Sequence, residues 1–172
     1  QRADLWLFDC GEGTQHQFLR SELRVSQLRR IFITHMHGDH VFGLPGLLAS
    51  LGMAGTCDGV DLYGPEPLEA FVLSALQHSA TRIGYPLRFH PVEAAASSGQ
   101  PLLVDGEFSV SCTPLKHRVP AFGYRDQQSE RPGRFDIAKA KAMRLPPGPE
   151  FARLKAGETV TFADGRRIDG RE

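Results

Sequence analysis

Three histidines and an aspartate are crowded together at the end of an apolar run, in the sequence ITHMHGDH. His35 and His37 are separated by one residue, so they point the same way in an extended segment and can converge on one cation in a tight loop. Asp39 and His40 follow across a glycine, a small residue that lets the chain turn closely beneath them. Imidazole nitrogens and a carboxylate oxygen suit zinc, with manganese or iron as competitors. The octet therefore predicts a metal site, with ligands that can serve two adjacent ions.

A further histidine lies far along the chain, in the stretch TPLKHRVPAFGYR. His117 follows a predicted strand, as expected for a ligand delivered to the same strand-end cleft. Its basic neighbours are typical of an exposed surface, so the prediction depends on the first cluster, which needs another nitrogen donor. His16, His78 and His90 have no such context and are interpreted as ordinary hydrogen-bonded histidines.

Both helices and strands are needed to position these side chains. Helix and strand signals alternate early in the chain and hairpins enter later, which predicts an α/β or mixed layered fold. We expect Thr14 to cap the first helix. The predicted elements are a strand at 5–8, a short helix from 14, a strand at 29–35, a helix within 41–55, a strand at 59–65, a helix at 66–80, a strand at 85–92, a polar loop at 93–100 and a hairpin at 101–117 turning at Asp105-Gly106.

Composition limits the classes of protein that the chain can represent. Its 172 residues suit one domain or part of a larger protein, and no apolar run approaches the roughly 18 residues of a membrane span. Twenty basic residues balance twenty acidic ones, so nucleic-acid binding would need a local patch. Three scattered cysteines, Cys10, Cys57 and Cys112, argue against a disulfide framework and favour a reducing compartment. The opening QRADLWLFDCGEG is typical of a strand entered midway, so we expect the N-terminus to lie upstream.

The composition changes after Tyr124, where arginine, lysine, glycine and proline become frequent. We therefore predict a core at 1–124 and a protruding arm at 125–172, although a solvated charged excursion is the alternative. The arm is predicted to contain a short helix at 136–143, a break at PPGP, a helical turn at 150–154 and a hairpin about Asp164-Gly165. Between residues 134 and 155 the arm has six basic residues and only two acidic ones, Asp136 and Glu150. The basic residues are Arg134, Lys139, Lys141, Arg144, Arg153 and Lys155.

Several motifs carry a family resemblance. HMHGDH resembles the motif of the metallo-β-lactamase superfamily, while LFDCGEGTQHQ, PGLL, HRVPAFGYR and the PPGP arm are similar to its ribonuclease Z (tRNA 3′-processing endonuclease) branch. The resemblance runs from Leu5 to Arg171 and implies a partial αββα sandwich with a protruding tRNA-binding arm. It also implies an N-terminal strand upstream, and a bridging aspartate and last histidine downstream of Glu172.

The resemblance implies a two-zinc centre, with Mn²⁺ as a possible substitute. His35, His37 and His117 would ligate one zinc, and Asp39 and His40 the second. Asp39 would also orient or deprotonate the attacking water.

A second aspartate is implied to support these ligands. Asp9 would accept a hydrogen bond from a ligand histidine and fix its tautomer. The alternative is that it only caps the turn before the next glycine.

The function that the resemblance implies is a zinc-dependent endoribonuclease that removes the 3′ trailer from precursor tRNA. It would leave a 3′-hydroxyl on the tRNA and a 5′-phosphate on the trailer, in the cytoplasm or an organelle of prokaryotic origin. The branch is homodimeric, and the segment GLPGLLASLGMAG is either an interface helix or an ordinary core helix. The arm residues expected to contact tRNA are Lys139, Lys141, Arg144, Gly148, Pro149, Arg153 and Lys155.

Two alternatives remain open at this stage. The octet does not choose the substrate, so a phosphodiesterase or other hydrolase of small esters on the same fold is possible. Because the downstream ligands are not in the chain, the second alternative is a catalytically incomplete fragment that binds RNA or a partner.

Overall fold

The structure is a computed structural model, and it describes residues 4–55, 58–129 and 134–171. The chain divides into two compact units, Gln1–Gln128 and Ser129–Glu172, which are described separately.

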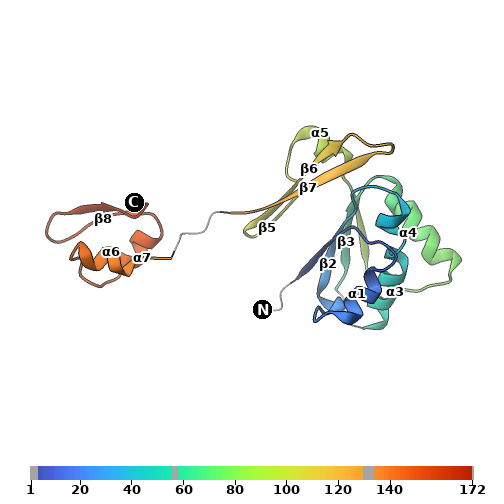
Figure 1. Ribbon diagram of the computed structural model, residues 1–172, viewed down its shortest axis with the longest axis horizontal. Helices are drawn as coiled ribbons and strands as arrows, with labels where there is room; N and C mark the ends of the chain where they lie inside the picture. Colours follow the sequence, from blue (N-terminus) through green and yellow to red (C-terminus); the bar gives the residue numbers. More distant parts are fainter. Residues whose placement is uncertain (1–3, 56–57, 130–133, 172) are drawn as a thin grey trace. The chain divides into compact units, whose positions relative to one another are not determined.

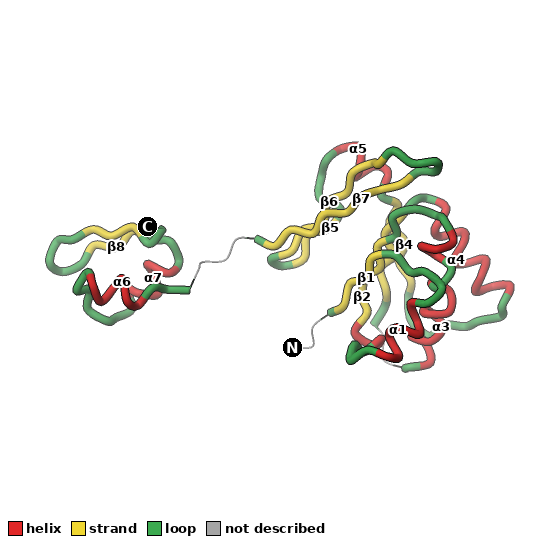
Figure 2. The backbone as a smooth tube through the Cα atoms, viewed as in Figure 1, coloured by secondary structure: helices red, strands yellow, loops and turns green. Residues whose placement is uncertain are grey.

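The elements follow one another closely along the chain (Figures 1 and 2). Within the described part, no helix has the length and apolar character needed to cross a membrane. In order, the elements are β1 (Leu5–Phe8), α1 (Thr14–Arg20), the 3-10 helix η1 (Val25–Gln27), β2 (Leu28–Phe32), α2 (Gly38–Val41), α3 (Leu44–Met53), β3 (Val60–Gly64), α4 (Pro67–His78), β4 (Leu87–Pro91), α5 (Glu93–Ser98), β5 (Leu103–Asp105), β6 (Phe108–Leu115), β7 (Ala121–Gln128), α6 (Ile137–Ala142), α7 (Glu150–Lys155), β8 (Thr159–Thr161) and β9 (Arg167–Asp169).

The first unit is built on a parallel sheet of four strands in the order β1-β2-β3-β4. Successive side chains of β2 and its continuation alternate between two hydrophobic clusters: Ile31 and Ile33 pack with the helices, and Phe32 packs with the second sheet. This explains the unbroken apolar run, because a parallel sheet is buried on both faces. The carboxyl ends of β1 and β2 lead into the residues predicted to bind metal.

Helices α1, α3 and α4 cover one face of this sheet (Figure 1). In α3 four leucines recur at helical spacing and are all buried, which is the apolar stripe of a helix on a sheet. The hydroxyl of Tyr85 donates a hydrogen bond to the carbonyl of Leu48 at 2.7 Å, so the loop before β4 is tied to α3.

The other face carries an antiparallel sheet in the order β5-β6-β7. Val110 and Phe122 from this sheet pack against Phe32. The hydroxyl of Tyr124 donates to the carbonyl of Ile33 at 2.8 Å, and burial raises the pKa of that phenol. The two sheets and the helix layer form the predicted metallo-β-lactamase-type layering of helix, sheet and sheet.

A row of stacked rings crosses all four parallel strands. Phe8, Phe32, Tyr63 and His90 are neighbours in the strand register, and successive ring centroids are 4.8, 4.8 and 4.4 Å apart at interplanar angles of 13°, 13° and 14°. Aromatic pairs between adjacent strands stabilise a sheet and oppose slippage. The row therefore keeps the four parallel strands in register near their carboxyl ends, just before the predicted metal ligands.

The second unit has a small hydrophobic cluster of its own. The predicted helices and hairpin of this segment are present. The Asp136 carboxylate accepts a hydrogen bond from the Lys139 backbone N–H at 2.8 Å and so caps α6, and Gly165 takes a φ of 85° in the β8–β9 turn. The buried members of the cluster are Ala140, Leu145, Leu154, Val160 and Phe162.

Two expectations about local structure were wrong. Thr14 is the first residue of α1 rather than its cap, because its N–H already bonds to Gly11 O at 3.1 Å. The segment 93–100 holds α5, since alanine is the strongest helix former and Gly99, with φ 69°, supplies the left-handed C-cap. The helix expected within 41–55 is confirmed as α3, and one further helical turn, α2, precedes it.

The hairpin at Asp105-Gly106 is confirmed, with φ 58° at the glycine. Cys10 and Cys112 are buried free thiols, and burial raises the pKa of Cys10 to about 11. Cys57 lies outside the described residues.

We predict that Phe32→Ala will lower the free energy of unfolding of the first unit by about 3–5 kcal/mol, because it empties the centre of the aromatic row. The side chain of Phe32 is 0% exposed. Phe42, which is 65% exposed, provides a matched control, and Phe42→Ala should cost less than about 1 kcal/mol. Urea unfolding followed through Trp6, the only tryptophan, measures both changes. Equal losses of unfolding free energy in the two variants would contradict the central place given to Phe32 in the core.

Candidate metal centre

The residue after β1 ties two strand ends together. Asp9 has a left-handed backbone with φ 59°, and its N–H donates to Phe32 O at 2.8 Å. One carboxylate oxygen accepts a hydrogen bond from the Thr34 N–H at 2.7 Å, and the other lies 2.8 Å from His40 Nδ1. The aspartate therefore holds both ends of the histidine-containing loop.

The backbone of the histidine-containing loop and its continuation packs directly against the backbone of the turn after β1. A Cβ added to Gly43 would lie 1.9 Å from Gly11 O, and one added to Gly11 would lie 2.5 Å from Asp39 O. The Cys10 N–H also donates to His40 O at 2.7 Å. Glycine is required at both positions because any larger residue would push the two segments apart.

A hairpin from the second sheet brings the distant histidine to the loop. Phe122 N–H donates to Thr34 O at 2.9 Å, and His35 forms an isolated antiparallel bridge with Ala121. His117 lies in the turn between β6 and β7 that immediately precedes these contacts. The bridge therefore places His117 beside a segment about eighty residues earlier in the chain.

Three imidazoles converge as a result. His35 Nε2 lies 3.1 Å from His37 Nδ1, and His117 Nε2 lies 3.3 Å from the same atom. One nitrogen from each of the three rings lies within 4.8 Å of the others. Nitrogen donors about 2.05 Å from a tetrahedral zinc are roughly 3.3 Å apart, so this donor set fits such an ion. The fold and the cluster together mark a metal-binding site.

Asp39 and His40 form a second pair beside this cluster. His40 Nε2 lies 3.4 Å from Asp39 Oδ2, and the His35 and His40 ring centroids are 4.0 Å apart. The Asp39 side chain is 75% exposed and open to solvent. The two groups adjoin, as a two-metal centre requires.

The electrostatics of the cluster favour the neutral form of His35. Burial, followed by the charges of His40, His117 and His37, lowers the pKa of His35 below its ordinary value. A neutral imidazole offers a lone pair, which is the form that binds a metal. His35 is therefore prepared for that role.

All the residues predicted for the metal site lie together, and the other histidines make different contacts. His78 Nδ1 lies 2.8 Å from Ser74 O, His90 Nε2 lies 2.8 Å from Asp61 Oδ1, and His16 is exposed. The sequence reasoning missed one residue, the threonine directly before the first histidine of the octet. A hydroxyl at the end of a buried strand was the available signal.

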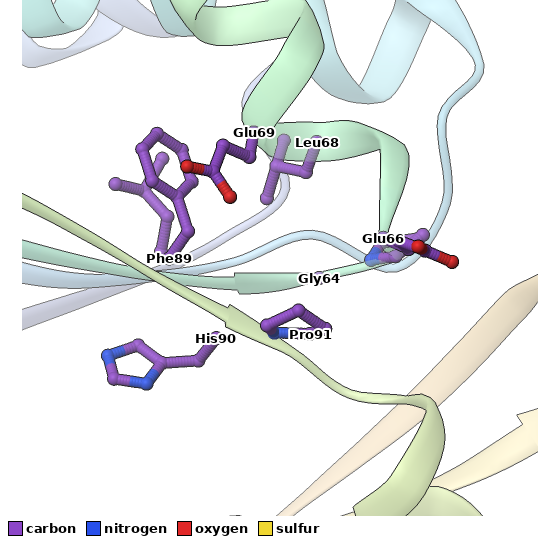
Figure 3. A pocket seen from close by; sticks show the side chains of 9 residues that line it. Gly64, Glu66, Leu68, Glu69, Phe89, His90 and Pro91 are labelled. Atoms are coloured by element: carbon purple, nitrogen blue, oxygen red, sulfur yellow. The ribbon is translucent and has the colours of Figure 1, made fainter.

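A hollow at the ends of β3 and β4 offers a poor alternative site (Figure 3). Its empty volume is about 160 Å³ including open solvent, below the range of about 300–1,000 Å³ usual for ligand pockets. The Glu66 and Glu69 carboxylates lie apart, and the His90 ring lies on the opposite side of the strand from Phe89. Its polar groups do not converge on one point.

Comparison with curated proteins shows similarity along the whole chain. It is 67% identical over 170 residues to Ribonuclease Z of Synechococcus sp. (strain WH7803), covering 99% of this chain and 53% of the relative. It is 60% identical over 172 residues to Ribonuclease Z of Prochlorococcus marinus (strain MIT 9313), covering 100% of this chain and 54% of the relative. The resemblance to ribonuclease Z is confirmed. The chain spans about half the length of these relatives.

Solved structures agree with this result. The short form of human tRNase Z (ELAC1) superposes with a TM-score of 0.64 at 34% identity, covering 74% of this chain and 55% of that one. YhfI from Bacillus subtilis, a metallo-β-lactamase fold protein, gives a TM-score of 0.52 at 18% identity, covering 71% of this chain and 45% of that one. The chain has the metallo-β-lactamase fold. A family model described as Anti-Pycsar protein Apyc1 also matches residues 2–84, the part that contains the octet.

We predict that His37→Ala will weaken binding of Zn²⁺ by at least about tenfold, because His37 Nδ1 faces both other imidazoles of the cluster. His78→Ala is the matched control, since among the described residues this exposed histidine bonds to Ser74 of its own helix, and it should leave the affinity for Zn²⁺ unchanged. Competition with a zinc chelator measures both values. Similar affinities in the two variants would show that zinc binds elsewhere.

Proposed function

We propose that the chain belongs to a zinc-dependent endoribonuclease that removes the 3′ trailer from precursor tRNA. The observation that supports this most strongly is the convergence of the three histidines with the Asp39–His40 pair. They lie on a chain similar throughout to proteins named Ribonuclease Z. The expected products are a tRNA 3′-hydroxyl and a trailer 5′-phosphate.

The chain's own residues divide the work of this reaction. His35, His37 and His117 would hold one zinc, and His40 and Asp39 would contribute to the second. When bound, the metals would act as Lewis acids and lower the pKa of water. Asp39, whose carboxylate is open to solvent, would orient the attacking water and accept its proton. Asp9 would keep the His40 imidazole in place through its 2.8 Å contact.

The second unit would act as the tRNA-binding arm. Lys139, Lys141, Arg144 and Lys155 are exposed, as are Gly148 and Pro149 in the loop before α7. Arg153 is exposed too, although its Nε lies 2.8 Å from Glu158 Oε2, which reduces the charge it can offer to a phosphate. Contacts to phosphates position an RNA without reading its sequence, as recognition of tRNA by shape requires.

We also propose that the active form is a homodimer. The buried leucines of α3 face the core, so the spacing of GLPGLLASLGMAG is explained by packing within the unit. Support for an interface comes from large side chains left outside, Leu19 at 79% and Met53 at 82% exposed. Their helices are joined by a hydrogen bond between Gln15 and Ser50. Burying such a surface is favourable.

The nuclease assignment predicts that Asp39→Ala will reduce cleavage of a 3′-extended tRNA by about 10²-fold or more, because the proposed proton acceptor is removed. The assay uses purified protein with Zn²⁺ or Mn²⁺ and follows release of the trailer on a gel. Asp126→Ala, at an exposed position on β7, is the matched control and should cleave normally. Cleavage that persists in Asp39→Ala would refute the role given to this carboxylate.

The arm assignment predicts that Lys139→Glu with Lys141→Glu will raise KM for precursor tRNA several-fold and flatten its salt dependence, because two phosphate contacts are lost. Hydrolysis of bis(p-nitrophenyl) phosphate should not change. Arg20→Glu with Arg24→Glu makes the same charge change on the first unit and serves as the control. An unchanged KM for precursor tRNA in the double lysine variant would contradict the arm assignment, whereas a protein that cleaves the small ester but no tRNA would favour the alternative of a small-ester hydrolase.

A further inference from the structure

We propose that Thr34 is a positioning residue for the metal centre: its hydroxyl selects the tautomer of His35 that presents a bare Nε2 to the cation. The inference rests on the metal centre of the proposed function, and it is independent of which substrate is cleaved.

The contacts of the Thr34 hydroxyl are the first step. Its oxygen lies 3.0 and 2.9 Å from the two carboxylate oxygens of Asp9 and 2.9 Å from His35 Nδ1. His40 Nδ1 is farther away, at 3.5 Å, and makes its closer contact of 2.8 Å with Asp9. The hydroxyl is thus placed between one carboxylate and one imidazole.

The proton count of this arrangement assigns the tautomer. A hydroxyl has one proton to donate, and a carboxylate can only accept. The Thr34 proton therefore goes to Asp9, and a hydroxyl lone pair faces His35 Nδ1. That contact is favourable only if Nδ1 carries the proton, so Nε2 is unprotonated. His35 Nε2 is the atom that lies 3.1 Å from His37 Nδ1 within the cluster.

Asp9 consequently orients two ligands by two routes. It contacts His40 directly and reaches His35 only through the Thr34 hydroxyl. Outer partners of this kind fix ring orientation and tautomer, and their loss typically costs about 10–100-fold in metal affinity. Without the hydroxyl, His35 would keep its place in the chain but lose the contact that chooses between its two tautomers.

A substitution can remove this contact alone. Thr34 N–H bonds to Asp9, and Thr34 O accepts from Phe122 N–H at 2.9 Å; both bonds use the backbone and survive a change of side chain. Thr34→Val keeps the β-branched shape and removes the hydroxyl, while Thr34→Ser keeps the hydroxyl. Thr81→Val, which removes a hydroxyl that lies 2.7 Å from the Ser79 hydroxyl in the described structure, is the control for loss of a threonine hydroxyl elsewhere.

The first measurement is the tautomer of His35 in the metal-free 172-residue chain. Long-range ¹H–¹⁵N correlation spectra at about pH 8, where imidazoles are neutral, distinguish protonated Nδ1 from protonated Nε2. We expect protonated Nδ1 in the unsubstituted chain, in Thr34→Ser and in Thr81→Val. Thr34→Val should show a mixture or the opposite tautomer. Unchanged His35 signals in Thr34→Val would overturn the proposal.

The second measurement is the affinity for Zn²⁺ by chelator competition. Thr34→Val should lose about tenfold or more, and Thr34→Ser should recover most of it. Thermal unfolding checks that each variant is folded. A loss in Thr34→Val that Thr34→Ser does not recover would assign the effect to packing and refute the proposal. Neither readout uses RNA, so a failed tRNA assay and a failed positioning role are separate results.

Discussion

The arrangement of the centre depends on the carboxylate of Asp9. It stands at the end of one parallel strand and accepts hydrogen bonds from the next strand and from His40. To reach these partners its backbone takes a left-handed conformation, which aspartate tolerates better than most residues. The loop with four of the five proposed ligands is thereby held at both ends.

The layers of the fold make this local bonding possible. The aromatic row on the parallel sheet levels the strand ends, and the antiparallel sheet packs on the same face. The bridge between His35 and Ala121 joins the β6–β7 hairpin to the segment that follows β2, so the distant histidine arrives as part of the sandwich. A site assembled from two sheets in this way can be rigid, as a preorganised metal centre requires.

The second unit combines a small hydrophobic cluster with a charged surface. Its hydrophobic cluster is small and is closed by short elements, such as α6 capped by Asp136 and the turn at Gly165. Lysines and arginines remain on the outside, where charge is effective against a polyanion. The chain thus has a basic second unit and a hydrogen-bonded histidine cluster in its first unit, although its formal net charge is +0.

The sequence by itself predicted the proposed metal ligands and determined most elements, because H-x-H-x-D-H after an apolar run and the two Asp-Gly turns are local patterns. Local reasoning misjudged the alanine-rich segment of α5, where helix propensity outweighed the polar look of the residues. Only the tertiary structure decided that His117 meets His37 and that Thr34 stands between Asp9 and His35. Those contacts join residues from different strands and sheets, and such distances are set by packing of the whole layer, which no local spacing encodes.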